Sequence, residues 1–206
     1  FHSFNESGRF TSACSGMVYG DQRLFARKDH EEHAFTCEPF HNLVQHNIIY
    51  DDGVSFNFRR DPAESDIDFF ASQDRWCRPV MVRTGPDGGL WVVDMYRYMI
   101  EHPDWLPPEG KEELRPHFRS GDDRGRIYRI VPKGSKPRPP TRLASLSTPQ
   151  LVAALDSANV WQRDSAQQLL VRNRDLSACD ALREMVYKSS NPLARLHAMC
   201  TLDGLD

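Results

Sequence analysis

The segment DRWCRPVMVRTGPDGGLWVVDMYRY, residues 74–98, carries the strongest strand and turn signals of this chain. PVMVRTG (79–85) is a candidate strand, and LWVVDMY (90–96) opens on a continuous apolar run, as expected for a strand covered on both faces. Between them, the glycines, proline and aspartate of 85–89 favour a tight turn and tolerate positive φ. The segment therefore predicts two strands joined by a short turn.

Further strands are predicted on both sides of this segment. In VSFNF (54–58) apolar and polar side chains alternate, which is typical of a half-buried strand. The turn signal Asp51-Asp52-Gly53 precedes it, so HNIIY (46–50) and VSFNF should form a hairpin. IDFFAS (67–72) is a candidate outer strand, and GRIYRIV (125–131) is a candidate strand after a long insertion.

Closely spaced strands with turns between them, and no helix of a βαβ unit, favour an all-β first part. The strands at 79–85, 90–96 and 125–131 follow one another as in one blade of a β-propeller. We therefore expect residues 1–132 to form the last one or two blades of a partial β-propeller. So few blades cannot close a ring, and the chain opens on Phe1 rather than Met, so we expect a fragment of a longer protein.

The character of the chain changes near residue 133. KGSKPRPPTR (133–142) is rich in proline and basic residues, and we expect a linker over 133–145. Residues 146–206 have helical periodicity, and Thr148-Pro149 and Asn191-Pro192 each place a capping residue before a proline. About four helices, in two pairs of roughly forty residues, favour the start of an α-helical HEAT-type repeat array. Such an array would offer a surface to a protein partner.

Composition and charge exclude several classes of function. The formal net charge is −3 and the pI is about 6.3, which argues against a nucleic-acid partner, because such a partner needs a basic face. The sequence has no signal peptide and no run of about 18 apolar residues, so it predicts no transmembrane segment. The five cysteines include no C-x-x-C pair, which excludes zinc-ribbon, thioredoxin-like and haem-attachment motifs within this chain. We expect buried free thiols, and a Cys77–Cys37 or Cys77–Cys14 disulfide is the alternative.

Four segments carry a resemblance to a known family. They are HAFTCEPFHNLV (33–44), FFASQDRWCRPVMVRTGPDGGLWVVDMYRYMIEHPDWLP (69–107), SGDDRGRIYRIVP (120–132) and RLHAMCTLDGL (195–205). In combination they resemble the bacterial family of membrane-bound dehydrogenases, which is similar to the sorbosone and glucose quinoprotein dehydrogenases. Cys77 departs from the family pattern, which usually has an aromatic residue after the tryptophan.

The resemblance implies a propeller, then HEAT-type repeats, then a c-type haem domain that lies outside this chain. It implies pyrroloquinoline quinone and calcium as cofactors, a sugar or an alcohol as substrate, and electron transfer to the c-type cytochrome domain. It also implies a periplasmic or membrane-associated location. The catalytic base of such enzymes lies in an early blade, so we expect this fragment alone to be inactive. The alternative is a non-catalytic scaffold of propeller and HEAT repeats that binds carbohydrate or protein.

Blade geometry predicts where a site would lie. If 79–85, 90–96 and 125–131 are successive strands, the loop before the first strand and the loop between the second and third emerge on one face. Charged and aromatic residues gather on this face: Asp74, Arg75, Trp76, Arg78, Asp94, Tyr96, Arg97, Glu101, His102, Asp122, Asp123 and Arg124.

The arginines of this face could pair with the carboxylates or quinone oxygens of an anionic cofactor, because a guanidinium binds a carboxylate with two hydrogen bonds and keeps its charge. The aromatic side chains could stack on a flat ring or on a sugar. The alternative is an internal network of arginines and aspartates that ties the 97–124 insertion to the strands. The candidate cofactor-binding residues are Arg78, Arg97, Arg124, Trp76, Tyr96 and Asp94.

Weaker candidates for catalysis and metal binding lie nearby. His41 could act as a general base or orient a ligand, and a hydrogen-bonded structural histidine is the alternative. His102 is a second candidate for catalysis, and the cap of a turn is its alternative. Asp122 and Asp123 offer oxygen ligands to calcium but lack the spacing of an EF-hand. His197, in LARLHAMC, is expected to be a packed residue of a helix.

Overall fold

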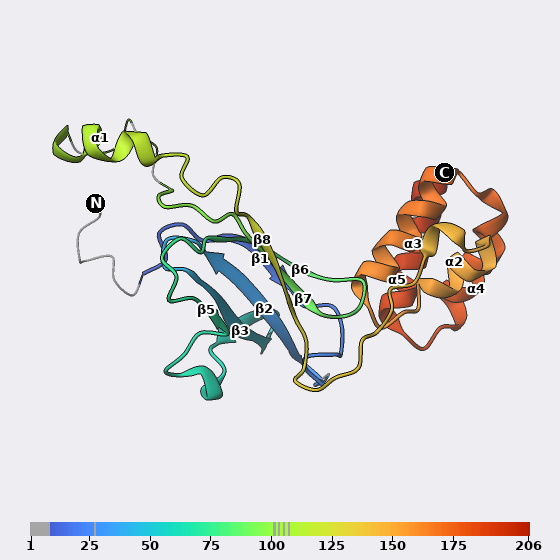
Figure 1. The fold of residues 1–206 in the computed structure, drawn as a ribbon. Coiled ribbons are helices and arrows are strands. Elements are labelled where there is room, and N and C mark those ends of the chain that lie inside the picture. Colours follow the sequence, from blue (N-terminus) through green and yellow to red (C-terminus); the bar gives the residue numbers. More distant parts are fainter. Residues whose placement is uncertain (1–8, 27, 101, 103, 105, 107) are drawn as a thin grey trace. The chain divides into compact units, whose positions relative to one another are not determined.

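The structure, a computed structural model, describes residues 9–26, 28–100, 102, 104, 106 and 108–206. The chain divides into two compact units (Figure 1). The first unit is built from Phe1–Tyr19, Ala26–Arg83 and Leu90–Ile130, and the second is built from Gly20–Phe25, Thr84–Gly89 and Val131–Asp206.

The larger sheet of the first unit is antiparallel. Its strands are β1 (Cys14–Val18), β2 (Glu31–Glu38), β3 (Leu43–Asp52), β4 (Ser55–Arg59) and β5 (Phe70–Ala71). They follow the order β1-β2-β3-β4, with β5 paired to β3. The β3–β4 hairpin confirms the predicted pairing of HNIIY with VSFNF.

The predicted half-burial of residues 54–58 is wrong. Phe56 and Phe58 on β4 are 70% and 67% exposed. β4 is an edge strand that pairs with β3, and within the described part of the chain its apolar side chains stay open to solvent. Alternation separates the two faces of a strand, but it does not show that either face is covered.

The smaller sheet of the first unit has the order β6-β7-β8. Its strands are β6 (Pro79–Thr84), β7 (Leu90–Asp94) and β8 (Arg126–Ile130), at the predicted positions. The long connection between β7 and β8 contains the helix α1 (Pro108–Leu114) and the short 3-10 helix η4 (Arg115–His117). Within this unit α1 lies away from the sheets (Figure 1).

The expected partial β-propeller is wrong. In the described part of the chain the two antiparallel sheets have five and three strands, which are too few for a propeller, and the fold is a small mixture of β-sheets and helices. A strand–turn–strand pattern determines which neighbours in sequence pair with each other. A propeller also needs four-stranded sheets repeated around an axis, which such a local pattern does not encode.

The cysteines are free thiols, as expected. Cys37 and Cys77 are buried, and burial raises the pKa of each thiol to about 12. Cys14 and Cys179 are half-buried and Cys200 is exposed, so these three depart from the expectation of burial.

The helices α2 to α5 make up most of the second unit. They are α2 (Thr148–Ala154), α3 (Val160–Asn173), α4 (Cys179–Lys188) and α5 (Pro192–Leu205). Asn159 and Asn191 cap α3 and α5 through their side-chain oxygens, and Asn191-Pro192 confirms the predicted cap. None of the described helices is long and apolar enough to cross a membrane.

The expected HEAT-type repeats are also wrong. α3 packs against both α2 and α5, and α5 packs against α4. One shared core receives residues from all four helices, among them Leu151, Leu170, Leu182 and Ala198. Helical periodicity identifies the buried face of each helix but not the partner of that face. Four helices around one core therefore have the same sequence signature as two stacked pairs.

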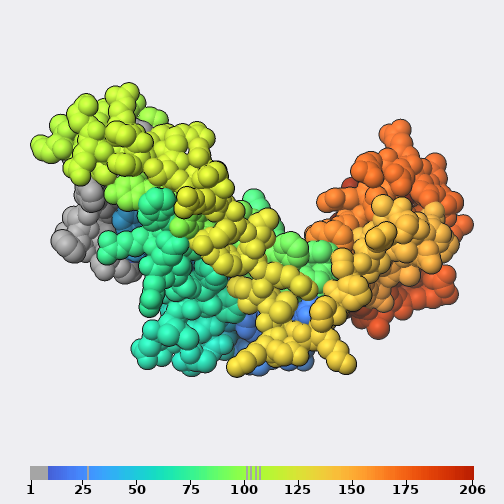
Figure 2. All heavy atoms as spheres, in the orientation of Figure 1, coloured from blue at the N-terminus to red at the C-terminus, as the bar shows by residue number. Residues whose placement is uncertain are grey.

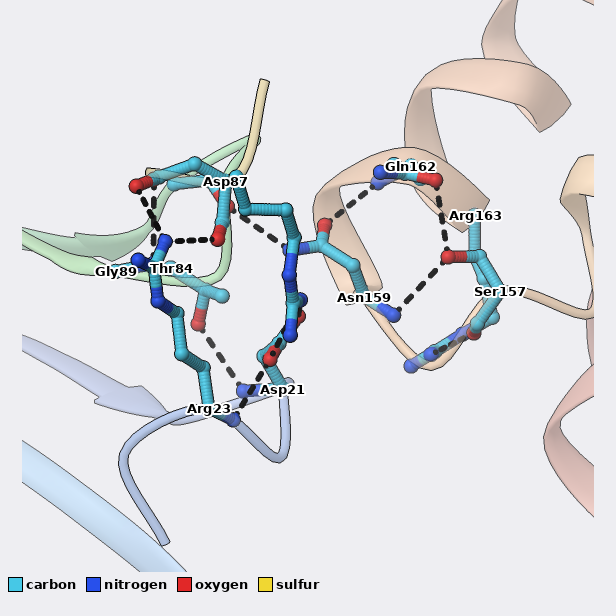
Figure 3. Close-up of polar contacts among 12 residues, drawn as sticks. Asp21, Arg23, Thr84, Asp87, Gly89, Ser157, Asn159, Gln162 and Arg163 are labelled. Carbon is cyan, nitrogen blue, oxygen red and sulfur yellow. Dashed lines mark hydrogen bonds and ion pairs between the residues drawn. The ribbon is translucent and has the colours of Figure 1, made fainter. Parts of the chain in front are cut away.

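Two short segments distant in sequence, 20–25 and 84–89, also belong to the second unit. Asp21 accepts a hydrogen bond from Asn159 Nδ2 at 2.9 Å and pairs with Arg138 Nη1 at 3.0 Å. The neighbourhood of Asp21 and Asn159 is drawn in Figure 3. Because Asn159 is the N-cap of α3, its bond to Asp21 attaches the 20–25 segment to the start of this helix.

The predicted tight turn lies at 85–89. Its Asp87 pairs with Arg23 Nη1 at 3.1 Å and accepts the N–H of Gly89 at 3.2 Å (Figure 3). Gly88 has a φ of +79°, and a Cβ there would lie 2.6 Å from an oxygen of Asp21. Both the positive φ and the close approach of Asp21 require glycine at this position.

Candidate functional site

The edge of the smaller sheet brings the predicted loops together. The segments 74–78 and 94–98 run side by side, because the N–H of Met95 donates to the carbonyl oxygen of Arg78 at 2.9 Å. β8 begins beside them at Arg126, which is the cross-strand partner of the last residue of β7. The strand order therefore gathers most of the predicted site residues at one edge.

Arg78 is buried, and its guanidinium donates to backbone carbonyl oxygens of other segments. Nη1 bonds to Pro39 at 3.0 Å, Nη2 to Tyr98 at 3.0 Å and Nε to Arg97 at 3.1 Å. The backbone N–H of Arg78 donates to Asp94 Oδ1 at 2.7 Å. In this geometry the side chain joins separate parts of the backbone.

Arg97 has the same kind of partners. Its Nη1 donates to the carbonyl oxygens of Met95 at 3.0 Å, Tyr96 at 2.9 Å and Gly121 at 3.0 Å. The last bond joins the beginning of the long β7–β8 connection to its end, since Arg97 and Gly121 both lie within it. Arg78 and Arg97 thus hold backbone segments together. The alternative to cofactor binding was a network of arginines and aspartates, and the pair that matches it is Arg126 with Asp94.

Asp94 is the acceptor at the centre of this edge, and its side chain is fully buried. Oδ1 accepts the backbone N–H groups of Arg78 at 2.7 Å and Tyr96 at 2.9 Å. Oδ2 accepts Nε and Nη2 of Arg126 at 3.1 and 2.9 Å. Sequence reasoning missed Arg126, although the alternation of RIYRI places it on the same side of β8 as Tyr128.

Trp76, Tyr96 and Tyr98 form an aromatic cluster beside Asp94. The ring centroid of Trp76 lies 5.7 Å from that of Tyr96 and 5.5 Å from that of Tyr98. Trp76 and Tyr96 are half-buried, and Tyr98 is 40% exposed. The guanidinium carbon of Arg126 lies 4.2 Å from the centroid of Tyr96, within cation–π range. The cluster therefore presents ring surface next to a positive charge.

Asp74 adds a negative charge to the rim of the aromatic cluster. Its Oδ2 lies 3.5 Å from Nη2 of Arg126. The backbone N–H of Trp76, followed by the hydroxyl of Tyr96 and the charge of Arg126, lowers the pKa of Asp74 below its ordinary value. Burial, and then the hydrogen bond to Asp74, raises the pKa of Tyr96. At neutral pH the rim thus holds an anionic carboxylate and a neutral phenol.

The remaining residues of the predicted face make other contacts. The side chain of Arg124 is 70% exposed, and its Nε lies 3.8 Å from Asp123 Oδ1. Asp122 pairs with Arg119 at 3.0 Å. In the described part of the chain neither aspartate belongs to a group of three metal-ligating side chains. Glu101 lies outside the described residues.

The two candidate histidines bond to nearby backbone. His41 Nε2 lies 2.9 Å from the carbonyl oxygen of Arg9, so this nitrogen donates the bond. His102 is exposed, and its Nδ1 accepts the N–H of Asp104 at 3.3 Å. Glu38 is buried and accepts backbone N–H groups of the 11–12 segment at 3.1 Å. His41, His102 and Glu38 thus hold loops in place through hydrogen bonds to the backbone.

The model of a domain of unknown function, DUF7133, matches residues 1–134, and the chain belongs to that family. No curated protein and no solved structure matches the chain.

Proposed function

We propose that this member of the DUF7133 family binds a saccharide on its aromatic cluster. The observation that carries the proposal is the partial exposure of Trp76, Tyr96 and Tyr98, in which the ring of Trp76 lies beside the rings of both tyrosines. A sugar ring has an apolar face of C–H groups that packs on aromatic rings, and its hydroxyl groups need hydrogen-bond partners. The cluster supplies the aromatic rings on which the apolar face of a sugar can pack.

The charged groups beside the cluster suit the hydroxyl groups of a sugar. The side chains of Asp74 and Arg126 are 40% and 41% exposed, so both reach solvent. A carboxylate accepts and a guanidinium donates, whereas a hydroxyl does both. Neighbouring hydroxyls of one ring could therefore bond to Asp74 and Arg126 together.

The arginine network favours sugar binding over cofactor chemistry. An anionic cofactor at Arg78 or Arg97 would have to displace backbone carbonyl oxygens from the guanidinium groups. Each buried carbonyl left without a partner costs about 1–3 kcal/mol. We therefore favour a non-catalytic role in carbohydrate binding.

A second candidate is the oxidation of a sugar or an alcohol with pyrroloquinoline quinone and calcium. The family resemblance implies this reaction, with a c-type haem partner and a periplasmic or membrane-associated location. One observation favours it, because the side chains of Arg124 and Arg126 are 70% and 41% exposed. Both guanidinium groups are therefore accessible to an anionic quinone from solvent.

A glycan array, followed by calorimetric titration of the full chain, tests the first proposal. We expect saturable binding of at least one mono- or oligosaccharide. Tyr98→Ala should weaken it about tenfold or more, which is ~1.4 kcal/mol, because this ring offers the most exposed surface of the cluster. Tyr187→Ala removes another exposed ring, on α4, and should leave the affinity unchanged.

Two outcomes would overturn sugar binding: no ligand on the array, or equal weakening by Tyr98→Ala and Tyr187→Ala. A titration with pyrroloquinoline quinone in calcium buffer separates the two candidates. Quinone binding that Arg124→Ala weakens would support the oxidoreductase proposal in place of the first.

A further inference from the structure

Two carboxylates of the loop that follows β4 lie close to a histidine of β3. His46, on β3, is buried, with Nδ1 3.0 Å from Glu64 Oε1 and Nε2 2.8 Å from His33 Nδ1. Ligand atoms of His46, Asp61 and Glu64 all lie within 4.8 Å of one another. Side chains from β3 and from the loop after β4 thus converge, and His33 of β2 contacts the histidine.

Glu64 has a buried oxygen that makes no hydrogen bond. Its side chain is 14% exposed, and among the residues that the structure describes no hydrogen-bond partner reaches Oε2. Buried polar atoms are nearly always paired, so this unpaired carboxylate oxygen indicates a partner other than the described residues. A cation would supply this partner.

The loop that carries the carboxylates is held by its own contacts. Arg60 Nη2 donates to the carbonyl oxygen of Glu64 at 2.9 Å. Asp61 caps the 3-10 turn η2 (Pro62–Glu64), because its Oδ1 accepts the N–H of Ala63 at 3.0 Å. This cap uses one carboxylate oxygen, and the second remains to bind a ligand.

The loop is also accessible to ions. Residues 60–68 lie on the surface that Figure 2 shows, where they are drawn in blue-green. Pro62, Ala63 and Ser65 are exposed, whereas His46 lies buried below them. An ion could therefore enter from solvent without passing through the core.

We propose that His46, Asp61 and Glu64 bind one divalent transition-metal ion, such as Zn²⁺. One imidazole and two carboxylates are a ligand set that Zn²⁺ and Co²⁺ accept, and the two negative charges balance the charge of the ion. Binding would draw the three ligand atoms closer together, to about 2.0–2.2 Å from the metal. The remaining coordination position is open to water.

His33 orients the histidine ligand. With the ion on Nδ1 of His46, the Nε2–H of His46 donates to His33 Nδ1, at the 2.8 Å separation that the structure shows. Metal-binding histidines almost always have such a second hydrogen-bond partner. A purely structural bond between Glu64 and His46 accounts for Oε1 of Glu64, but it leaves Oε2 without a partner.

Titration of the metal-free full chain with Co²⁺, followed by visible absorption, tests the proposal. We expect saturable absorption bands at one Co²⁺ per chain, and Zn²⁺ should abolish them. Asp61→Asn is the sharpest variant, because asparagine keeps the turn cap and removes the charge. Asp61→Asn and Glu64→Gln should each weaken Co²⁺ binding about tenfold or more.

His30→Gln is the matched control. It breaks an exposed histidine–carboxylate pair of the same unit, His30 with Asp51, and should leave the Co²⁺ affinity unchanged. Absence of saturable Co²⁺ and Zn²⁺ binding in the wild-type chain would overturn the proposal. So would variants of Asp61 and Glu64 that lose stability but bind Co²⁺ as tightly as the wild type does.

Discussion

Asp94 accepts the backbone N–H of Arg78 at 2.7 Å, which joins the end of β7 to the start of β6. The same carboxylate binds Arg126 at the start of β8. One buried side chain therefore connects all three strands of the smaller sheet. The aromatic cluster lies at this edge, so its geometry depends on Asp94.

Asp94→Ala should strongly destabilise the first unit. It leaves the N–H groups of Arg78 and Tyr96 without their acceptor and removes the partner of Arg126. We expect the free energy of unfolding to fall by about 3 kcal/mol, because buried donors lose their bonds. Arg126→Ala should cost about 1 kcal/mol or less, since this side chain is partly exposed and solvent screens its charge. Urea unfolding measures both variants, and equal losses would contradict the central role of Asp94.

Gly88→Ala tests the close approach of Asp21 to the tight turn. Gly134 is the matched control in the same unit, with a φ of +73° and no atom within 4 Å of the position that a Cβ would occupy. Both alanine variants incur the cost of a positive φ, about 1 kcal/mol. Gly88→Ala should lose about 1–3 kcal/mol more, because its Cβ collides with Asp21. Equal thermal unfolding midpoints for the two variants would show that the turn moves away freely.

Asn159 has two roles that substitution can separate. Its Oδ1 accepts the N–H of Gln162 at 3.0 Å, which caps α3, and its Nδ2 donates to Asp21 at 2.9 Å. Asn159→Asp keeps the cap but places a second carboxylate against a buried one. We therefore expect Asn159→Asp to be at least as destabilising as Asn159→Ala in urea unfolding. If Asn159→Asp lowers the free energy of unfolding less than Asn159→Ala does, the cap of α3 contributes more to stability than the contact with Asp21.

His197 should make stability depend on pH. Its Nδ1 lies 2.8 Å from Gln167 Oε1, as expected for a packed histidine, and burial, followed by Arg163, lowers its pKa below 6.5. Asp164, 3.8 Å away, opposes this shift. Below about pH 6.5 His197 binds a proton in the unfolded chain but stays neutral in the folded chain. Its contribution to the free energy of unfolding is therefore complete above that pH and is lost as the pH falls towards the folded-state pKa. His197→Gln should reduce the loss of unfolding free energy between about pH 7 and 5. An unchanged pH dependence would contradict this assignment.

Much of the secondary structure could be predicted because its signals are local. The apolar run at 90–93 and the glycines of 85–89 specify a strand and a turn from adjacent residues. Asn191-Pro192 specifies a helix start in the same way. The architecture could not be predicted from such signals, because it depends on which buried faces meet. The expected propeller and HEAT repeats were therefore wrong.

The candidate site also combines features that local signals predict with contacts that they do not. Strand pairing between neighbours in sequence was enough to place Asp94, Trp76 and Tyr96 at one edge, because antiparallel pairing brings the start of one strand beside the end of the next. The partners of Arg78 were a different matter, since Pro39 and Tyr98 are 39 and 20 residues away from it.

The convergence of His46 with Asp61 and Glu64 had no sequence signal, because the histidine lies on β3 and the carboxylates lie in a loop beyond β4. Periodicity and turn chemistry act within a few residues, and this short range made the strands and helix ends of this chain predictable from its residues. A buried guanidinium or an unpaired carboxylate oxygen finds its partners across the fold. Packing between distant segments therefore determines which groups the buried guanidinium of Arg78 contacts, and these are backbone carbonyl oxygens of Pro39, Arg97 and Tyr98.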